Sequence, residues 1–422
     1  MAEDDIYGSK ARYELFVKDL AVLIVPKPFI QTKRGYRGYY CKNSANLDYF
    51  RRLIAKFESR DLSYVRRLRL LQDLKIVVHF TEKDLKELAR EDIDQIVARV
   101  NTSQSSESAS DFKTHLKIIW KLILPETDEK NRPDESITPY VVRHLKSYID
   151  KSRQKRRIDK LSWEEFERIV TFFSDKPCIQ AYLMLALESL GRPQELLWRK
   201  IKDVELYDNY AKIYLSSHGK EGIGILQCID SYAYLTSWLN EHPFRKNPDA
   251  FLFVNSKGDQ YSNFAINKHM RIACEKLQIN KPITCYSLKR NGVTLRRLRG
   301  DTDVEIQRAA RWSSTKQLKT YDLSDQDDAF KLELVKRGLI EPEHGFEHLK
   351  PKTRPCVHCG ALNKFTDVTC NHCNRPLDRK RILELQREDE LRALKDFMTI
   401  PQVKELFETV YRLKKKVEGR SK

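Results

Sequence analysis

Apolar residues recur at helical spacing through residues 46–124. The repeat is clearest in two groups, which are Leu47, Phe50, Leu53, Ile54 and Phe57, followed by Leu68, Leu70, Leu71 and Leu74. Acidic, cap-like starts at residues 81–84 and 90–93 predict two helix beginnings, and the polar residues 102–111 predict a loop before the next helix. The pattern therefore predicts a small domain of about four helices.

The pattern changes after residue 160. Ser162 followed by Glu165 forms a capping box, so a helix is expected to start there and to run through the apolar residues 183–187 toward Gly191. Residues 211–215 alternate as a strand, residues 218–222 form a glycine-rich turn, and residues 223–226 return as the partner strand. Helices are also expected at about 230–240, 263–276 and 287–299. This half predicts a mostly helical α+β domain that ends near residue 340.

Three less regular segments accompany these two domains. The Gly/Tyr/Arg residues 34–40 are either a loop or a source of aromatic and arginine contacts to nucleic acid. The basic residues 151–157 are a solvated hinge, the flexible linker of a protein that clamps around DNA, or both. Residues 378–418 have the periodicity of one or two charged amphipathic helices, with a break at Ile400 and Pro401.

The length of 422 residues favours two or three domains over one core. We expect a mainly α protein with a small β-sheet. Its predicted parts are an N-terminal arm (1–44), a helical domain (45–150), a basic linker (151–160), an α+β domain (161–340), a cysteine-rich ribbon (354–377) and a charged helical tail (378–422).

The charge balance favours a polyanionic partner. Lys and Arg number 78 against 60 Asp and Glu, a formal net charge of +18, and cations that neutralise phosphates release counterions. No run of about 18 apolar residues predicts a membrane span. The acidic start of the sequence is unlike a signal peptide, so a cytoplasmic protein without a membrane partner is expected.

The cysteines are the clearest signal that rests on spacing alone. Four of the nine form two Cys-x-x-Cys pairs, Cys356 with Cys359 and Cys370 with Cys373. Four thiolates so placed can close a tetrahedral, structural zinc site, which leaves no open position for catalysis. His358 and His372 stand inside the pairs as less favoured alternative ligands. One metal site among scattered thiols is typical of a cytosolic protein rather than of a disulfide framework.

Four distant segments carry residues suited to attack on a phosphodiester. Arg192 stands between Gly191 and Pro193 at a predicted helix start, where a guanidinium and the helix N-terminus both favour an anion. Lys220 lies in the predicted hairpin turn, and residues 286–290 form a second basic segment. Tyr321 lies in the last of the four segments. A nucleophile, cations for the phosphate oxygens and an acid for the leaving oxygen are the parts that such a reaction needs.

The order and spacing of these parts resemble the tyrosine recombinase (phage-integrase) family, in particular archaeal-type integrases, which often carry a C-terminal zinc ribbon. The resemblance covers roughly residues 45–340 and is most specific at 191–196 and 304–323. It implies that the helical domain is a core-binding (SAM-like) DNA-binding domain and that the α+β domain is catalytic.

The resemblance also assigns roles to single residues. It makes Arg192 the first catalytic arginine, Glu195 the glutamate that orients the site, and Lys220 the hairpin lysine that protonates the leaving oxygen. Trp312 takes the position where the family accepts His or Trp, and Tyr321 becomes the nucleophile.

One motif departs from the family. Where H-x-x-R is usual, this sequence has Tyr286 and Lys289, so a hydroxyl and a point charge replace a histidine and a two-pronged guanidinium. Arg290 is adjacent, although one residue along a helix turns the side chain by about 100°. Either basic residue can replace the second arginine, and a degenerate, inactive site is the alternative.

The function implied by the resemblance is site-specific cutting and rejoining of double-stranded DNA through a 3′-phosphotyrosine intermediate. It requires no catalytic metal or nucleotide, and it implies a homo-oligomer, a tetramer, on DNA. A catalytically degenerate DNA-binding regulator and a type IB-like topoisomerase are the alternatives.

Overall fold

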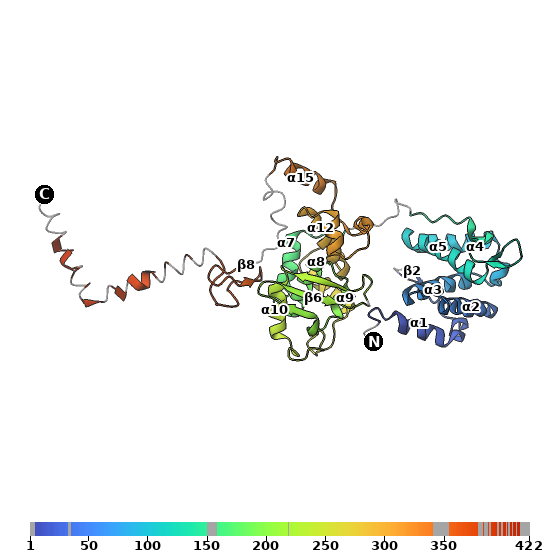
Figure 1. Ribbon diagram of the computed structural model, residues 1–422, viewed down its shortest axis with the longest axis horizontal. Coiled ribbons are helices and arrows are strands. Elements are labelled where there is room, and N and C mark those ends of the chain that lie inside the picture. Colours follow the sequence, from blue (N-terminus) through green and yellow to red (C-terminus); the bar gives the residue numbers. More distant parts are fainter. Residues whose placement is uncertain are drawn as a thin grey trace. The chain divides into compact units, whose positions relative to one another are not determined.

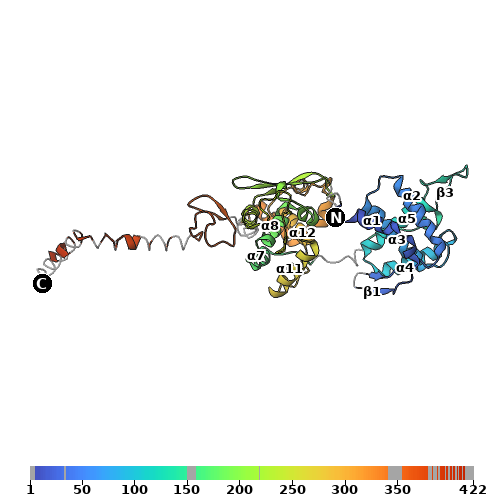
Figure 2. The same ribbon diagram turned by 90° about the horizontal axis from the view of Figure 1, so that it is seen from below.

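The structure of the chain is a computed structural model (Figures 1 and 2). It describes residues 5–32, 35–149, 158–217, 219–340 and 354–378, together with short runs of positions between 383 and 413. The chain divides into two compact units, Met1–Arg157 and Ile158–Lys422. The basic residues 151–157 and most of the expected helical tail lie outside the described residues.

The first unit is helical. Its longer helices are α1 (Ser9–Lys18), α2 (Leu47–Glu58), α3 (Tyr64–Phe80), α4 (Arg90–Ser103) and α5 (Ser106–Ile123), followed by the single turn α6 (Tyr140–Arg143). Short 3-10 helices lie at Leu20–Ile24, Ser44–Asn46 and Leu85–Glu87. Two small hairpins pair β1 (Ile30–Thr32) with β2 (Gly35–Arg37) and β3 (Glu126–Thr127) with β4 (Pro133–Asp134).

The periodic apolar residues of the sequence form the core of this unit. Phe50 and Leu53 of α2 and Leu71 of α3 are fully buried, as are Phe112 and Leu116 of α5. The segment expected as an N-terminal arm contributes to the same core, because α1 packs on α3 and Tyr13 is buried there.

Two details of the helical prediction are wrong. The start predicted at 81–84 leads only to the 3-10 helix Leu85–Glu87, because the chain then turns into α4 at Arg90. The loop predicted at 102–111 is almost entirely helical. Its serines cap the junction of two helices: the Ser105 side chain accepts a hydrogen bond from the backbone N–H of Ser108 at 3.3 Å, at the start of α5.

The second unit combines helices with one three-stranded sheet. Its helices are α7 (Trp163–Phe172), α8 (Pro177–Ser189), α9 (Pro193–Leu197), α10 (Tyr232–Glu241), α11 (Asn263–Lys276), α12 (Cys285–Leu298), α13 (Asp303–Ala309), α14 (Leu318–Tyr321) and α15 (Gln326–Lys336). The antiparallel sheet has the order β5 (Val204–Leu206), β6 (Ala211–Leu215), β7 (Gly224–Cys228). Ala211 pairs with Cys228 and Leu215 with Gly224, so the expected hairpin is present.

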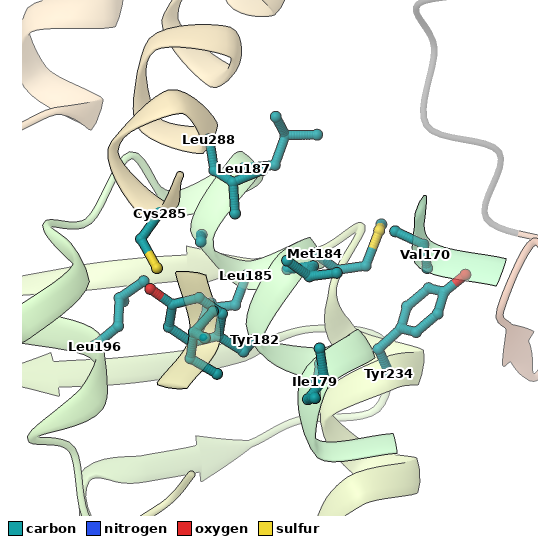
Figure 3. Close-up of a cluster of buried hydrophobic side chains, with 14 of the residues drawn as sticks. Val170, Ile179, Tyr182, Met184, Leu185, Leu187, Leu196, Tyr234, Cys285 and Leu288 are labelled. Carbon is teal, nitrogen blue, oxygen red and sulfur yellow. The ribbon is translucent and has the colours of Figure 1, made fainter. Parts of the chain in front are cut away.

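Helix α8 is the centre of this unit. It is apolar on all sides, as expected of a helix with no face toward water, and it packs against α10, α12 and β7. Figure 3 shows Tyr182, Met184 and Leu185 of α8 among residues from the surrounding elements. Gly292 lets α12 approach closely, because a Cβ there would lie 2.0 Å from the carbonyl oxygen of Leu187. This approach fixes the position of α12, which carries residues 286–290.

The cysteine-rich segment forms a small ribbon with the strands β8 (Arg354–Pro355) and β9 (Leu362–Asn363). It rests on the second unit through Phe365. The Phe365 ring lies 6.1 Å from the ring of Trp163 and 5.7 Å from that of Tyr234, measured between centroids. The apolar contact joins the ribbon to α7 and α10.

The predicted fold class, mainly helical with a small sheet, is confirmed. Within the part of the chain that the structure describes, no helix is both long and apolar enough to cross a membrane.

Candidate active site

Arg192 is positioned by the junction between α8 and α9. Helix α8 is followed by its C-cap residue Leu190, which has a left-handed backbone (φ 53°), and Arg192 is the extended N-cap residue of α9 (φ −72°, ψ 143°). Its backbone N–H donates to Glu195 Oε2 at 3.2 Å, and Pro193 fits the first position of the helix. The Arg192 side chain is buried, with Nη1 4.0 Å from Glu195 Oε1. Glu195 therefore contacts both the backbone and the side chain of Arg192.

The β6–β7 turn folds over this junction. Gly219 lies against Glu195, because a Cβ at Gly219 would be 2.7 Å from Glu195 Oε1. Lys220 follows and is exposed, so its ammonium is accessible to a ligand bound at the site. The next residue, Glu221, forms an ion pair with Arg192 through its Oε2 atom. The turn thus brings a carboxylate to the guanidinium of Arg192 and a cation near Lys289.

Lys289 points into the same region from α12. Its side chain is fully buried, and its Nζ atom lies 5.6 Å from the ring centroid of Trp312 and 5.4 Å from that of Tyr321. Burial lowers the pKa of the Lys289 ammonium to about 7, and the charge of Arg192 acts in the same direction. A bound anion would reverse this effect, because a negative charge favours the protonated form.

Arg290 points elsewhere. Its Nε atom donates to Asp159 Oδ2 at 2.8 Å, and its Nη2 atom contacts the same carboxylate and the hydroxyl of Ser287. Lys289, and not Arg290, is therefore the basic residue of this segment that faces Arg192. The divergence follows from the turn of about 100° between neighbouring helix positions.

Tyr286 lies in the first turn of α12, near the other site residues. Burial raises the pKa of its hydroxyl, the positive charge of Arg192 opposes that rise, and the charges of Tyr321 and Glu195 add to it. The hydroxyl is therefore protonated at neutral pH, so it can donate a hydrogen bond and is a poor base.

Tyr321 is the last residue of α14 and is partly buried. Its ring packs on Trp312 with 5.1 Å between the centroids. Trp312 itself is buried in a small apolar cluster with Leu190, Val293, Ile306, Ala310 and Leu318. This cluster holds the Tyr321 segment against the end of α8 and the middle of α12. With the contact of Glu221 to Arg192, the four predicted segments meet.

One residue of the site was missed by the motif comparison. Arg311, directly before Trp312, donates from Nη2 to Glu195 Oε2 at 2.6 Å. Its backbone is left-handed, with φ 58°. The available signal was a basic residue beside the tryptophan, but arginines are common in this chain and its spacing does not reveal a contact with Glu195.

The site holds several buried donors without an acceptor. Among the described residues, Lys289 Nζ, Trp312 Nε1, and Nε and Nη1 of Arg311 are buried and make no hydrogen bond. Buried donors are normally paired, and buried cations without an acceptor are costly. Their convergence around Tyr321 and Arg192 fits an anion with several oxygen atoms, such as a phosphate.

The four expected cysteine ligands also converge. The Sγ atoms of Cys356, Cys359, Cys370 and Cys373 all lie within 4.8 Å of one another. Two pairs, Cys356 with Cys373 and Cys359 with Cys370, are separated by 3.6 Å. Tetrahedral zinc with Zn–S bonds of about 2.3 Å requires sulfur separations of roughly 3.8 Å. The donor set therefore fits structural zinc.

Comparison with known proteins agrees with this geometry. Residues 159–327 match the phage integrase family. The matched segment contains all of the converging residues from Arg192 to Tyr321. No curated protein matches the sequence.

Solved tyrosine recombinase structures share the fold. XerH site-specific recombinase bound to a palindromic difH substrate is 15% identical, with 69% of this chain and 87% of that chain covered and a TM-score of 0.53. A lambda integrase dimer bound to a COC′ core site is 15% identical, covering 66% of this chain and 95% of that one, with a TM-score of 0.52. The Tn1549 transposon integrase in complex with transposon right end DNA is 13% identical, with 69% of this chain and 99% of that chain covered and a TM-score of 0.53. At these identities the likeness establishes the fold, while the roles of single residues rest on the site.

Proposed function

We propose that this protein is a site-specific DNA recombinase or integrase that cuts and rejoins double-stranded DNA through a 3′-phosphotyrosine intermediate. The observation that carries the proposal is the meeting of Tyr321 with Arg192, Lys289 and Trp312, which come from distant parts of the sequence. The phage integrase match and the net charge of +18 support it.

In the proposed reaction the Tyr321 hydroxyl releases its proton to water as its oxygen attacks a DNA phosphorus atom, and the bond to the 5′-oxygen breaks. Arg192 and Lys289 hold the non-bridging oxygens, and the Trp312 indole N–H adds a hydrogen bond. Lys220 protonates the leaving 5′-oxygen. Rejoining is the reverse attack by a 5′-hydroxyl, which recovers the bond energy held in the phosphotyrosine link. The chemistry of the site therefore requires neither a nucleotide nor a catalytic metal.

Glu195 serves as a positioning residue in this proposal. Its carboxylate accepts from the backbone N–H of Arg192 at 3.2 Å and from Arg311 at 2.6 Å, which fixes the first helical turn of α9. Tyr286 takes the place of the family's histidine as a hydrogen-bond donor to phosphate.

We propose that the four cysteines bind structural zinc and that the chain is an archaeal-type integrase with a C-terminal ribbon. Zinc would hold the two knuckles together, and Phe365 then keeps the ribbon on the second unit. The proposed partner is double-stranded DNA bound by a homo-oligomer. Support comes from solved relatives of the same fold, including a lambda integrase tetramer bound to a Holliday junction.

A covalent-trapping experiment tests the function. The purified chain is incubated with nicked, end-labelled duplexes that carry a randomised segment, so that the short 5′-hydroxyl fragment diffuses away after cleavage. The wild-type chain should retain label in a denaturing protein gel, and Tyr321→Phe should bind the same duplexes without retaining label. Tyr148→Phe, an exposed tyrosine of the first unit, is the matched control.

A second function is favoured by one specific contact. Glu221 is paired with Arg192 and occupies the guanidinium that a phosphate would need. If the wild-type chain binds DNA but forms no covalent adduct with any duplex, a non-catalytic DNA-binding regulator is the better description.

A further inference from the structure

Arg311 combines a strained backbone with a buried side chain. Its φ of 58° lies in the left-handed region that favours glycine, and only about a tenth of the side chain is exposed. A left-handed backbone is unfavourable for a residue other than glycine and persists where its surroundings enforce it. The side chain rather than the backbone is therefore the reason to keep an arginine at this position.

Two neighbours hold the guanidinium in place. Glu195 accepts a hydrogen bond from Arg311 Nη2 at 2.6 Å. Gly224, at the start of β7, leaves room for the stem of the side chain, because a Cβ there would lie 2.6 Å from Arg311 Cδ. The anchored carboxylate and the space beside the hairpin fix the direction of the guanidinium.

This anchoring leaves a complete donor edge without an acceptor among the described residues. A guanidinium has five N–H groups, and an oxygen pair can bind either across Nε and Nη2 or across Nη1 and Nη2. Glu195 uses one hydrogen of Nη2, and Nε and Nη1 are buried without an acceptor among the described residues. Whichever Nη2 hydrogen Glu195 accepts, one of the two edges stays free.

Arg311 lies near the other cations of the site. The charge of Arg311 lowers the pKa of Lys289, as does the charge of Lys220, so these groups are near one another. Lys289 offers a point charge where a two-pronged contact is usual in the resembled family. Arg311 can supply the missing bidentate contact from a different segment of the chain.

We propose that Arg311 is a phosphate-binding residue of the catalytic site and supplies the two-pronged contact that Lys289 lacks. Its role toward a DNA phosphate depends on the proposed recombinase function, whereas its role toward an anion does not. With Arg192, Lys220 and Lys289, it gives the site more positive charges than the carboxylates Glu195 and Glu221 cancel. This excess suits a phosphorus centre whose negative charge grows in the transition state.

Two variants test the proposal in the full chain. Arg311→Ala removes the guanidinium, and Arg311→Lys keeps a cation beside Glu195 but removes the donor edge. The control Arg308→Ala removes an exposed arginine of α13 that is not part of the cluster. Thermal unfolding of each variant identifies any that fails to fold, and Arg311→Lys retains the Glu195 pairing.

Two readouts are needed. Isothermal titration with inorganic phosphate measures the anion site without chemistry, and the single-turnover rate of adduct formation on the trapped duplex measures the reaction. We expect phosphate affinity to fall about tenfold or more in Arg311→Ala, and adduct formation to slow by about 10² in both Arg311 variants. Arg308→Ala should stay within about twofold of wild type, because an exposed charge contributes little at the site.

The outcomes separate this inference from the proposed function. If folded Arg311 variants match wild type in adduct formation while Tyr321→Phe abolishes it, the recombinase stands and the role of Arg311 is wrong. If no duplex gives an adduct but phosphate binding depends on Arg311, the anion site stands and the recombinase function fails. If wild type gives neither phosphate binding nor an adduct, both proposals are wrong.

Discussion

Lys289 should make the free protein less stable at acidic pH than a neutral residue would. Its side chain is fully buried, and its pKa is about 7 against an ordinary value of 10.5. In the unfolded chain the same lysine titrates near its ordinary value, so between pH 7 and 10.5 the unfolded state binds more protons than the folded state. The free energy of unfolding therefore rises with pH through that window. Below the window Lys289 is protonated in the folded state, and the free energy of unfolding is reduced by the full cost of burying the charge.

The magnitude follows from this pKa difference. At about 1.4 kcal/mol for each pKa unit, the full effect is on the order of 4–5 kcal/mol, and about 2–3 kcal/mol of it falls between pH 9 and pH 6. Lys289→Met keeps an unbranched side chain of similar length and has no charge. The free energy of unfolding of Lys289→Met minus that of wild type should thus grow by about 2–3 kcal/mol from pH 9 to pH 6.

Urea denaturation of both proteins at four pH values measures this difference, with tryptophan fluorescence as the signal. Four of the five tryptophans lie in the second unit. Lys316→Met, which removes an exposed lysine near Tyr321, should show no such trend. A stability difference between Lys289→Met and wild type that does not change with pH would refute a buried lysine with a depressed pKa. Phosphate should reduce the difference, since a bound anion favours protonated Lys289.

Three further predictions concern the turn, the helix contact and the ribbon. Glu221→Gln removes a carboxylate that competes with phosphate for Arg192, so the phosphate affinity measured by titration should rise several-fold. An unchanged affinity would mean that Glu221 does not occupy the anion position. Gly292→Ala places a Cβ 2.0 Å from the Leu187 carbonyl oxygen, so the free energy of unfolding should fall by about 1–3 kcal/mol or more. An unchanged free energy of unfolding in urea denaturation would contradict the close approach of α8 and α12. Metal analysis should find one zinc per chain in wild type and none in Cys370→Ser, whereas equal zinc contents would exclude the four-thiolate site.

Much of the fold is encoded in local pattern. The helix predicted at 263–276 matches α11 (Asn263–Lys276), and the hairpin predicted around Lys220 forms between β6 and β7. The serine-rich residues 102–111 were predicted as a loop but are almost entirely helical, because serine serves helix N-caps as well as loops. Nothing in the local sequence reports that α1 packs on α3, since that depends on which apolar faces meet.

The site was predictable as far as spacing carries information. Arg192 and Tyr321 were identified by motif, and the structure brings their segments together. The choice between Lys289 and Arg290 needed the direction of two neighbouring side chains on α12, and the ion pair of Arg290 with Asp159 settles which of them faces Arg192. Arg311 was missed because its partner Glu195 is remote in sequence and only the folded chain joins them.

The proposed function depends on a covalent bond between the Tyr321 oxygen and a DNA phosphorus atom. Its most direct test is mass spectrometry of the trapped adduct after nuclease and protease digestion. We expect one modified peptide, with the 3′-phosphate of a nucleotide on Tyr321. A nucleotide attached to a different residue, or an unmodified Tyr321 peptide from a protein band that retains DNA, would contradict it.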